Sequence, residues 1–294
     1  MVQLLQYVRR RAEWLRGGQT AETTHPAGLG THIQLWVLVI AVVFPIAIAV
    51  IVSTKETGIV TNLGDLFPGT YAVENYREAV VDYQFGRFMW NSLAMSIVIV
   101  VGKLVVSIFA AMAIVYYRVP YKDLVFLFIL FTLLLPVPVR FIPLYELMND
   151  LGWTNTILAI TVPYLASATT VFILRQHFLS IPTSIVETAK LDGIGPFRFM
   201  LSVLIPMSKG VLVGVSIIMF VYAWNQYLWP LIIIESEANQ VAQVGLKLLQ
   251  GDVQGGQLSW PLVMAGSTLT LLPPLLLMIV FRKPLLETFN LQQK

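Results

Sequence analysis

Charged and hinge-forming residues gather in one short segment of an otherwise apolar chain. The segment holds Glu187, Lys190 and Asp192, ends its charged run at Gly193 and reaches Pro206 thirteen residues later. Carboxylate and ammonium groups on such a segment form charge-assisted hydrogen bonds with a partner. Because apolar stretches long enough to cross a bilayer lie on both sides of it, the segment predicts a docking surface for a cytoplasmic protein.

Residue patterns that would support catalysis or metal binding are missing from the sequence. The Gly102–Lys103 pair is followed by leucine and lies in an apolar stretch, so it does not form a phosphate-binding loop. The chain has no cysteine, and its three histidines lack metal-ligand spacing. No apolar stretch has a carboxylate at its centre, which disfavours proton or ion coupling. We therefore expect no catalytic residue, no metal and no cofactor bound by this chain, and an energy source elsewhere.

Composition places the chain in a membrane. Hydrophobic residues make up 57% of the 294 residues and charged residues only 12%, against about 25% charged in an average soluble domain. Mean hydropathy is +0.75. A globule of this composition would be insoluble, so we predict an all-α, polytopic membrane protein.

Six stretches approach the roughly 20 apolar residues that a membrane-spanning helix needs. They cover residues 32–53, 90–116, 124–139, 154–174, 210–234 and 258–281. The third is the shortest and contains Pro136 and Pro138, which predict a break near its outer end. We expect a cytoplasmic segment with a short interfacial helix at residues 1–31, one six-span domain at residues 32–281 and a cytoplasmic tail at residues 282–294.

The distribution of basic residues predicts the orientation. With the N-terminus inside, thirteen of the 19 Lys and Arg residues fall in cytoplasmic segments and five in outer loops. This asymmetry follows the positive-inside rule. We expect both termini, and the segment at about residues 181–206, to lie on the cytoplasmic side of a prokaryotic inner membrane.

Local signals within that segment predict a helix–turn–helix. Pro182, with Ser184 and Glu187 spaced as a capping box, marks a helix start, and Gly193 supplies a left-handed stop. Pro196 opens a second helix over residues 197–205, with apolar side chains at helical spacing. The alternative is a solvated loop that only connects two spans, but a plain connector needs neither the glycine hinge nor the apolar residues.

This segment resembles the EAA motif of permease subunits of ABC importers. The motif has Glu-Ala-Ala, three residues, Gly, nine residues, Ile, one residue and Leu-Pro, and the spacing matches at every step. Thr188, Val203 and Ile205 are conservative departures. The resemblance implies coupling helices that dock into a groove on a cytoplasmic ATPase. The residues expected to carry this role are Glu187, Ala189, Asp192, Gly193, Arg198 and Pro206.

The resemblance extends over most of the chain after residue 76, to the second permease subunit of carbohydrate-type importers. It rests on residues 91–92, 135–145, 151–156, 172–178 and 224–230. Residues 135–143, 166–170 and 222–231 look most like the branch that imports sn-glycerol-3-phosphate or glycerophosphodiesters. A permease for a neutral oligosaccharide is the alternative. An ion-coupled secondary transporter and a membrane enzyme are more distant alternatives.

The resemblance implies which partner subunits assemble with this chain and how the complex transports its solute. It implies a homologous second permease, two ATPase subunits that use ATP and magnesium, and an extracytoplasmic solute-binding protein. ATP binding would close the ATPase dimer, and the coupling helices would transmit that motion. The cavity between the permeases would then open outward to accept solute from the binding protein.

Three sets of residues are candidates for the solute pathway or its gate. A polar and aromatic run interrupts the fifth stretch near its outer half, at Trp224, Asn225, Gln226, Tyr227 and Trp229. It indicates either an aromatic belt at the interface or a bundle-facing surface, and the amides favour the second because amides in lipid are costly.

The other two candidates are cations. Lys103 lies within the second stretch, either snorkelling or facing the bundle, or as a functional cation in the pathway. Arg140 follows the third stretch, where it is an interfacial anchor, a partner in an intersubunit salt bridge, or a bidentate ligand for a phosphate group.

Overall fold

The structure is a computed structural model that describes residues 28–56, 66–251 and 259–282. The regular elements in these residues are α-helices with short 3-10 and π segments, and these residues contain no strand. The predicted all-helical class is therefore confirmed. The expected N-terminal interfacial helix lies outside the described residues, as does nearly all of the C-terminal tail.

The chain divides into two compact units, residues 1–48 and 49–294. Helix α2 (Leu29–Val52) starts in the first unit and ends in the second, and it matches the first predicted span. Its 24 residues contain no charged side chain, although Pro45 lies inside it. At 1.5 Å per residue this helix is about 36 Å long, enough to cross a hydrocarbon core of about 30 Å.

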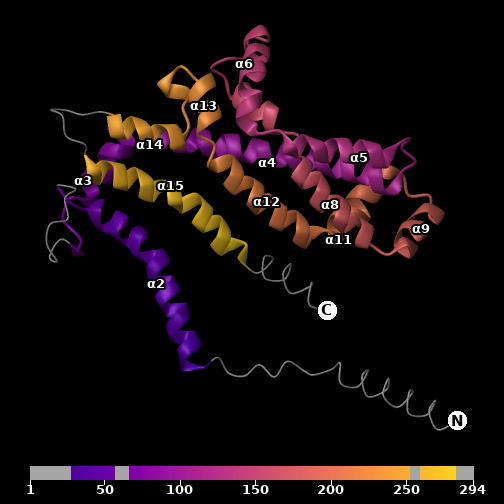
Figure 1. Cartoon of the computed structure of the whole chain (residues 1–294), viewed down its shortest axis with the longest axis horizontal. Coiled ribbons are helices and arrows are strands. Elements are labelled where there is room, and N and C mark those ends of the chain that lie inside the picture. Colours follow the sequence, from indigo (N-terminus) through magenta and orange to yellow (C-terminus); the bar gives the residue numbers. More distant parts are fainter. Residues whose placement is uncertain (1–27, 57–65, 252–258, 283–294) are drawn as a thin grey trace. The chain divides into compact units, whose positions relative to one another are not determined.

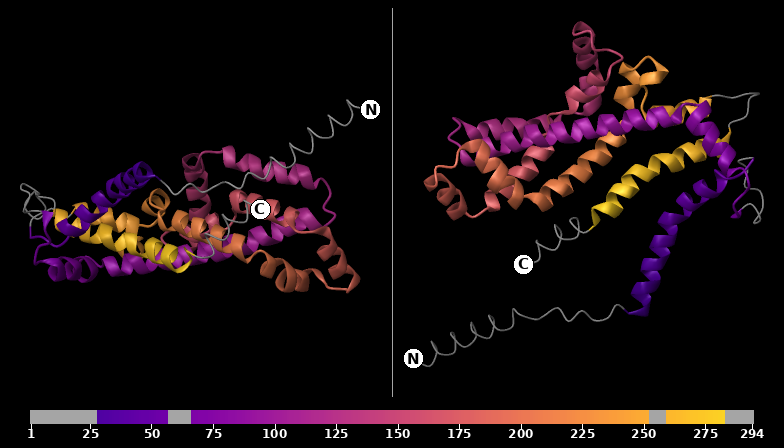
Figure 2. Two further views of the ribbon diagram at one scale, coloured as in Figure 1. Left: turned by 90° about the horizontal axis from the view of Figure 1, so that it is seen from below. Right: turned by 180° about the vertical axis from the view of Figure 1, so that it is seen from behind.

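Helix α4 (Phe85–Tyr116) is the longest described helix of the second unit and contains the second predicted span. Helices α8 (Ala168–Ser180) and α12 (Lys209–Trp224) lie along it, as Figures 1 and 2 show from three sides. One end of α4 lies near α14 (Ala242–Gly251) and the other near α9 (Thr183–Leu191), and these ends are far apart (Figure 1). Helix α4 thus extends from α14 to the segment that is predicted to dock a cytoplasmic protein.

The third predicted span breaks where the prolines predict. Helix α5 (Lys122–Phe131) continues as η3 (Thr132–Leu134), and after the break η4 (Val137–Arg140) leads into α6 (Phe141–Asp150). The two halves are bent by 100°. Proline lacks an N–H and clashes with the preceding turn, so carbonyls at the break lose their helical partners. The Nη2 of Arg140 donates to two of them, on Thr132 and Leu135.

The fourth span is also bent. Helix α7 (Ile157–Thr161) and η5 (Val162–Tyr164) meet α8 at an angle of 40°. The hydroxyls of Thr156 and Ser167 cap α7 and α8 by accepting from backbone N–H groups three residues later.

The fifth predicted span is interrupted as its polar run indicates. Helix α12 ends at Trp224, and α13 (Leu228–Ile233) begins three residues beyond Asn225. A 3-10 turn, η7 (Glu237–Asn239), and α14 follow.

The sixth span is α15 (Trp260–Val280), which contains Pro273 and Pro274. Between α2 and α4 lie two short elements, α3 (Ala72–Arg77) and η2 (Glu78–Asp82). Three described helices are long and apolar enough to cross a membrane, or up to six segments if each bent pair is one span.

Candidate functional site

The predicted helix–turn–helix is present between α8 and α12. Helix α9 is followed by α10 (Pro196–Phe199), a π segment η6 (Met200–Leu204) and α11 (Ile205–Met207). We call these four elements the hairpin. A break at Ser208 and a bend of 83° separate the hairpin from α12.

The predicted capping box at the start of the hairpin is wrong. Pro182 occupies the N-cap, and no side chain among the described residues caps α9. The helix begins at Thr183, two residues earlier than the capping box requires, so Ser184 lies inside it. The Ser184 carbonyl instead accepts from the hydroxyl of Thr188 at 2.8 Å.

Gly193 ends α9 as predicted. Its φ of +66° lies in the left-handed region, where a side chain would be strained. The N–H of Ile194 donates to the Ala189 carbonyl at 3.0 Å, and the N–H of Gly193 donates to the Lys190 carbonyl at 3.1 Å. These two hydrogen bonds form a Schellman motif, which satisfies the last carbonyls of the helix and turns the chain toward α10.

The two faces of the hairpin differ in character. Val186 and Ala189 are buried in an apolar cluster with residues of α10 and η6 and with residues of α4 and α8, among them Ile108, Met112, Leu174 and Phe178. Ala189 therefore packs beneath the surface rather than forming it.

The opposite face is exposed. Glu187, Asp192 and Arg198 are exposed there, and so is Pro206. Within the residues that the structure describes, none of the three charged side chains takes part in an ion pair. Leu191 and Phe197 are also exposed, at 88% and 63% of their surfaces. This combination of unpaired charges and two large apolar side chains suits a protein partner.

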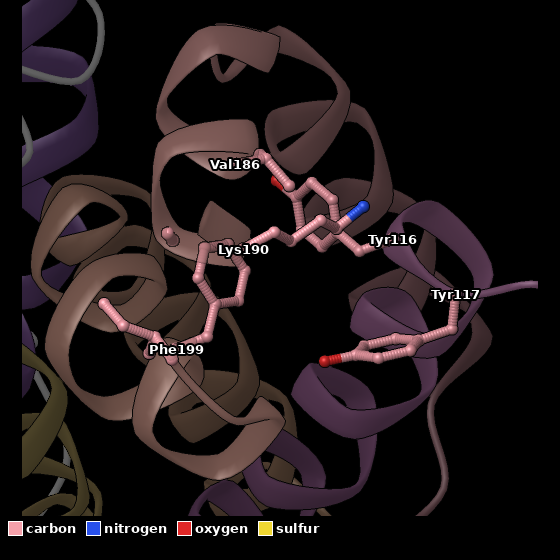
Figure 3. Close-up of a pocket in the computed structure, with 7 residues that line it drawn as sticks. Tyr116, Tyr117, Val186, Lys190 and Phe199 are labelled. Carbon is pink, nitrogen blue, oxygen red and sulfur yellow. The ribbon is translucent and has the colours of Figure 1, made fainter. Parts of the chain in front are cut away.

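Tyr116, at the end of α4, connects the hairpin to the bundle. Its hydroxyl donates to the Phe178 carbonyl at 2.7 Å, its ring stacks on Phe178, and it meets the ring of Phe199 edge-on at 5.5 Å between centroids. Figure 3 shows Tyr116, Val186, Lys190 and Phe199 around one small pocket. Sequence analysis missed this residue, because a tyrosine at the end of an apolar helix has no distinguishing local pattern.

The polar and aromatic run after α12 separates into buried and exposed members. Trp224 and Trp229 are 1% and 0% exposed. Their Nε1 atoms donate to the carbonyls of Thr270, at 3.0 Å, and Ala159, at 2.9 Å. Both rings are therefore buried within this chain, where they join its helices to each other.

The amides of the same run remain accessible. Asn225 is exposed, and its Oδ1 accepts from the Nε2 of Gln243 on α14 at 3.2 Å. Gln226 is half-buried, and Tyr227 is half-buried against the apolar cluster that contains Trp229.

Comparison with known proteins identifies the family. Residues 103–283 match the family described as "Binding-protein-dependent transport system inner membrane component". This chain belongs to that family. Relatives over most of the chain include the "sn-glycerol-3-phosphate transport system permease protein UgpE" of Brucella melitensis, 39% identical over 269 residues that cover 87% of this chain and 95% of the relative. The protein of the same name from Rhizobium meliloti is 38% identical over the same shares.

A solved structure confirms the permease fold. A protein of the "bacterial ABC transporter involved in the import of the acidic polysaccharide alginate" superposes with a TM-score of 0.78 and 21% identity, over 90% of this chain and 98% of that one. The permease is thus a non-catalytic membrane subunit of the ABC transporter type, in which separate subunits hydrolyse ATP. Such permeases function with a second permease, an ATPase and a binding protein.

The two predicted cations of the permease lie in different surroundings. Lys103 is buried, 4% exposed, with its Nζ 3.8 Å from the Sδ of Met219 and 4.3 Å from the ring centroid of Tyr222. It therefore faces α12 and not lipid. Arg140 is exposed and uses its guanidinium on the backbone carbonyls at the break after η3. In the described part of the chain no group of three or more His, Cys, Asp or Glu residues could hold a metal.

Proposed function

We propose that this chain is one of two permease subunits of an ATP-driven importer for sn-glycerol-3-phosphate or a related glycerophosphodiester. The observation that carries the proposal is the match to several permeases named for sn-glycerol-3-phosphate transport, over 87% of this chain and at 37–39% identity. Two ATPase subunits, which use ATP and magnesium, an extracytoplasmic solute-binding protein and a homologous permease complete the complex.

In this proposal the exposed face of the hairpin is the docking surface for an ATPase. Glu187, Asp192 and Arg198 offer charges that have no partner within the described chain, and Leu191 and Phe197 offer apolar contacts. The thirteen-to-five distribution of basic residues supports a cytoplasmic position for the hairpin and for both termini.

Motion of the hairpin would be transmitted to the membrane-spanning helices through two connections. Its buried face shares one apolar cluster with α4 and α8, and its last helix leads through Ser208 directly into α12. Packed interfaces of this kind switch between discrete arrangements rather than deform continuously. ATP binding would therefore bias the permease toward an outward-open state, in which Asn225 and Gln226 contribute to the gate or to solute contacts.

The experiment that tests docking is co-purification. We would tag the C-terminus, extract the complex in mild detergent, and compare wild type with Glu187→Lys. The expected result is an ATPase and a second permease with wild type, and less ATPase with the charge reversal. Glu146→Lys is the matched control, because Glu146 is an exposed carboxylate on α6, and α6 lies far from α9 (Figure 1). A chain that purifies alone yet transports after reconstitution would contradict the proposal.

The solute is tested by uptake and competition in the reconstituted complex. We expect uptake of labelled sn-glycerol-3-phosphate that glycerophosphodiesters inhibit and neutral oligosaccharides do not. The opposite pattern would favour the neutral-oligosaccharide alternative.

A phosphate-binding role for Arg140 is tested in the same assay with Arg140→Gln. Its two backbone hydrogen bonds support the anchoring role. An equal fall in the uptake of charged and neutral solutes would exclude Arg140 as a phosphate ligand.

A further inference from the structure

The side chain of Lys103 is a cation buried far from both ends of the membrane-spanning helix α4. Only 4% of its surface is exposed. Ionisable residues inside a membrane protein are costly and mark pathways or relays when they persist. The family match begins at this residue but assigns it no role.

The groups that surround Lys103 are neutral. Its Nζ contacts the thioether of Met219 at 3.8 Å and lies 4.3 Å from the ring centroid of Tyr222, one turn further along α12. From α8, the hydroxyl of Ser167 approaches the same thioether at 4.0 Å and accepts from the hydroxyl of Thr170 at 3.0 Å. Among the residues that the structure describes, no carboxylate pairs with Lys103.

These neighbours do not satisfy an ammonium group. A thioether is a weak acceptor, and a cation–π contact offsets only part of the cost of removing a charge from water. An ammonium group in such a site gains most from an anion that replaces one of its neutral neighbours.

Tyr222 is the neighbour that an anion could replace. Its ring contacts Lys103, yet 42% of its surface is exposed. Ile218 and Asn225 are also exposed and stand four residues before and three residues after it, so the three lie on one face of α12. Tyr222 thus lies between Lys103 and this exposed face of α12, which ends at Asn225.

The position of this tyrosine on α12 connects it to the hairpin. Helix α12 begins at Lys209, immediately after the break at Ser208 that ends the hairpin. A rotation or shift of α12 driven from the hairpin would move Tyr222 relative to Lys103, which is fixed on α4.

We propose that Lys103 is the anion-binding residue of the solute pathway and that Tyr222 covers it in the closed state. When α12 moves, the phosphate group of the solute takes the place of the tyrosine ring against the ammonium group. This inference rests on the proposed function, because it assigns the phosphate ester of the solute to one residue. No bond is made or broken, and the charge of the phosphate is balanced during passage.

The test uses the whole complex, with the second permease, the ATPase and the binding protein. The complex is trapped with ATP and vanadate in the presence of labelled sn-glycerol-3-phosphate, and the retained label gives an apparent Kd. Lys103→Met introduces an unbranched side chain only one heavy atom shorter than that of lysine, and it removes the charge. We expect it to raise the Kd roughly tenfold to a hundredfold, the loss typical of one hydrogen bond to a charged group.

Two variants separate anion binding from a structural role. Lys103→Arg keeps the charge and should retain most of the affinity. Ser96→Ala is the matched control, because Ser96 is a buried polar residue on the same helix whose hydroxyl has no hydrogen-bond partner in the described part of the chain. Inorganic phosphate should compete with the label in wild type and in Lys103→Arg, but not in Lys103→Met. An unchanged Kd and unchanged phosphate competition in Lys103→Met would overturn the inference.

A second measurement separates failure of this inference from failure of the proposed solute. The chain has no cysteine, so Lys103→Cys introduces its one thiol. A water-soluble thiol reagent should label this chain in the vanadate-trapped complex and not in the nucleotide-free complex. If wild type retains no sn-glycerol-3-phosphate, the proposed solute is wrong, and the labelling still decides whether Lys103 becomes accessible. No labelling in either state would overturn the inference.

Discussion

Polar and aromatic residues are placed in opposite ways in the hairpin and at the C-terminal end of α12. In the hairpin, the charged residues of the motif are exposed and have no ion-pair partner among the described residues, while small and apolar residues pack beneath them. At the end of α12, the two largest residues of the run, Trp224 and Trp229, are buried and hydrogen-bonded to neighbouring segments, whereas Asn225 is exposed.

This difference shows that a residue singled out by a sequence motif can either lie on the surface, where it is available to a partner, or lie in the interior, where it stabilises the packing of the helices. Hydration keeps the charges of the hairpin at the surface, because burial without a partner would cost free energy. A tryptophan has a large apolar body and one donor, so it is most stable where the body is buried and the donor meets a carbonyl. Substitutions in the two regions should therefore differ in whether they affect stability or function.

The largest expected effect on stability is at Trp229. Trp229→Ala removes a fully buried ring and leaves the Ala159 carbonyl without its partner. We expect a loss of about 3 to 5 kcal/mol in stability, seen as a lower melting temperature of the purified complex in detergent. A melting temperature of Trp229→Ala equal to that of wild type would contradict this structural role of Trp229.

A smaller effect is expected at the hinge of the hairpin. Gly193→Ala forces a side chain into a backbone with φ of +66°, although no atom of the described residues lies within 4 Å of the added carbon. We expect a cost of roughly 1 to 2 kcal/mol, together with reduced solute-stimulated ATP hydrolysis. Gly195→Ala is the matched control, since its added carbon also meets nothing and its φ is negative. Equal behaviour of the two variants would exclude the conformational explanation.

The connection between the hairpin and α4 is tested at Tyr116. Tyr116→Phe keeps both ring contacts and removes the hydrogen bond to the Phe178 carbonyl. We expect a loss of about 1 kcal/mol in stability, and a weaker coupling of ATP hydrolysis to uptake. The ratio of ATP hydrolysed to solute imported measures the coupling, and an unchanged ratio would limit Tyr116 to a structural role.

The smallest effect on stability is expected at the amides. Replacement of Asn225 and Gln226 by Leu should change stability by no more than about 0.5 kcal/mol, as at other surface positions. Uptake should nevertheless fall, because the amides would no longer offer polar contacts at the gate. Assembly is checked by co-purification, and full uptake with intact assembly would remove these residues from the pathway.

Sequence analysis predicted the helical class, the break at Pro136, the interruption after Trp224 and the turn at Gly193, because each depends on local chemistry. It was wrong about the capping box, since the N-cap is Pro182, two residues before Ser184.

Sequence analysis did not predict the connection at Tyr116 or the covering of Lys103 by Tyr222. Both contacts join residues far apart in the chain, at separations of 62 residues for the Phe178 hydrogen bond and of more than a hundred for α4 with α12. No local sequence pattern encodes a contact between residues so far apart in the chain.

The sequence by itself determined that this chain is a membrane permease with a charged hairpin between its spans. Apolar runs set the spans, since the backbone in lipid must satisfy its own hydrogen bonds, and glycine and proline set the turns through their restricted dihedral angles. Only the tertiary structure decided which side chains of the polar and aromatic run face inward, and that Lys103 lies against α12. The reason is that side-chain direction in a bundle depends on which helices pack together, and close packing of neighbouring helices settles that choice.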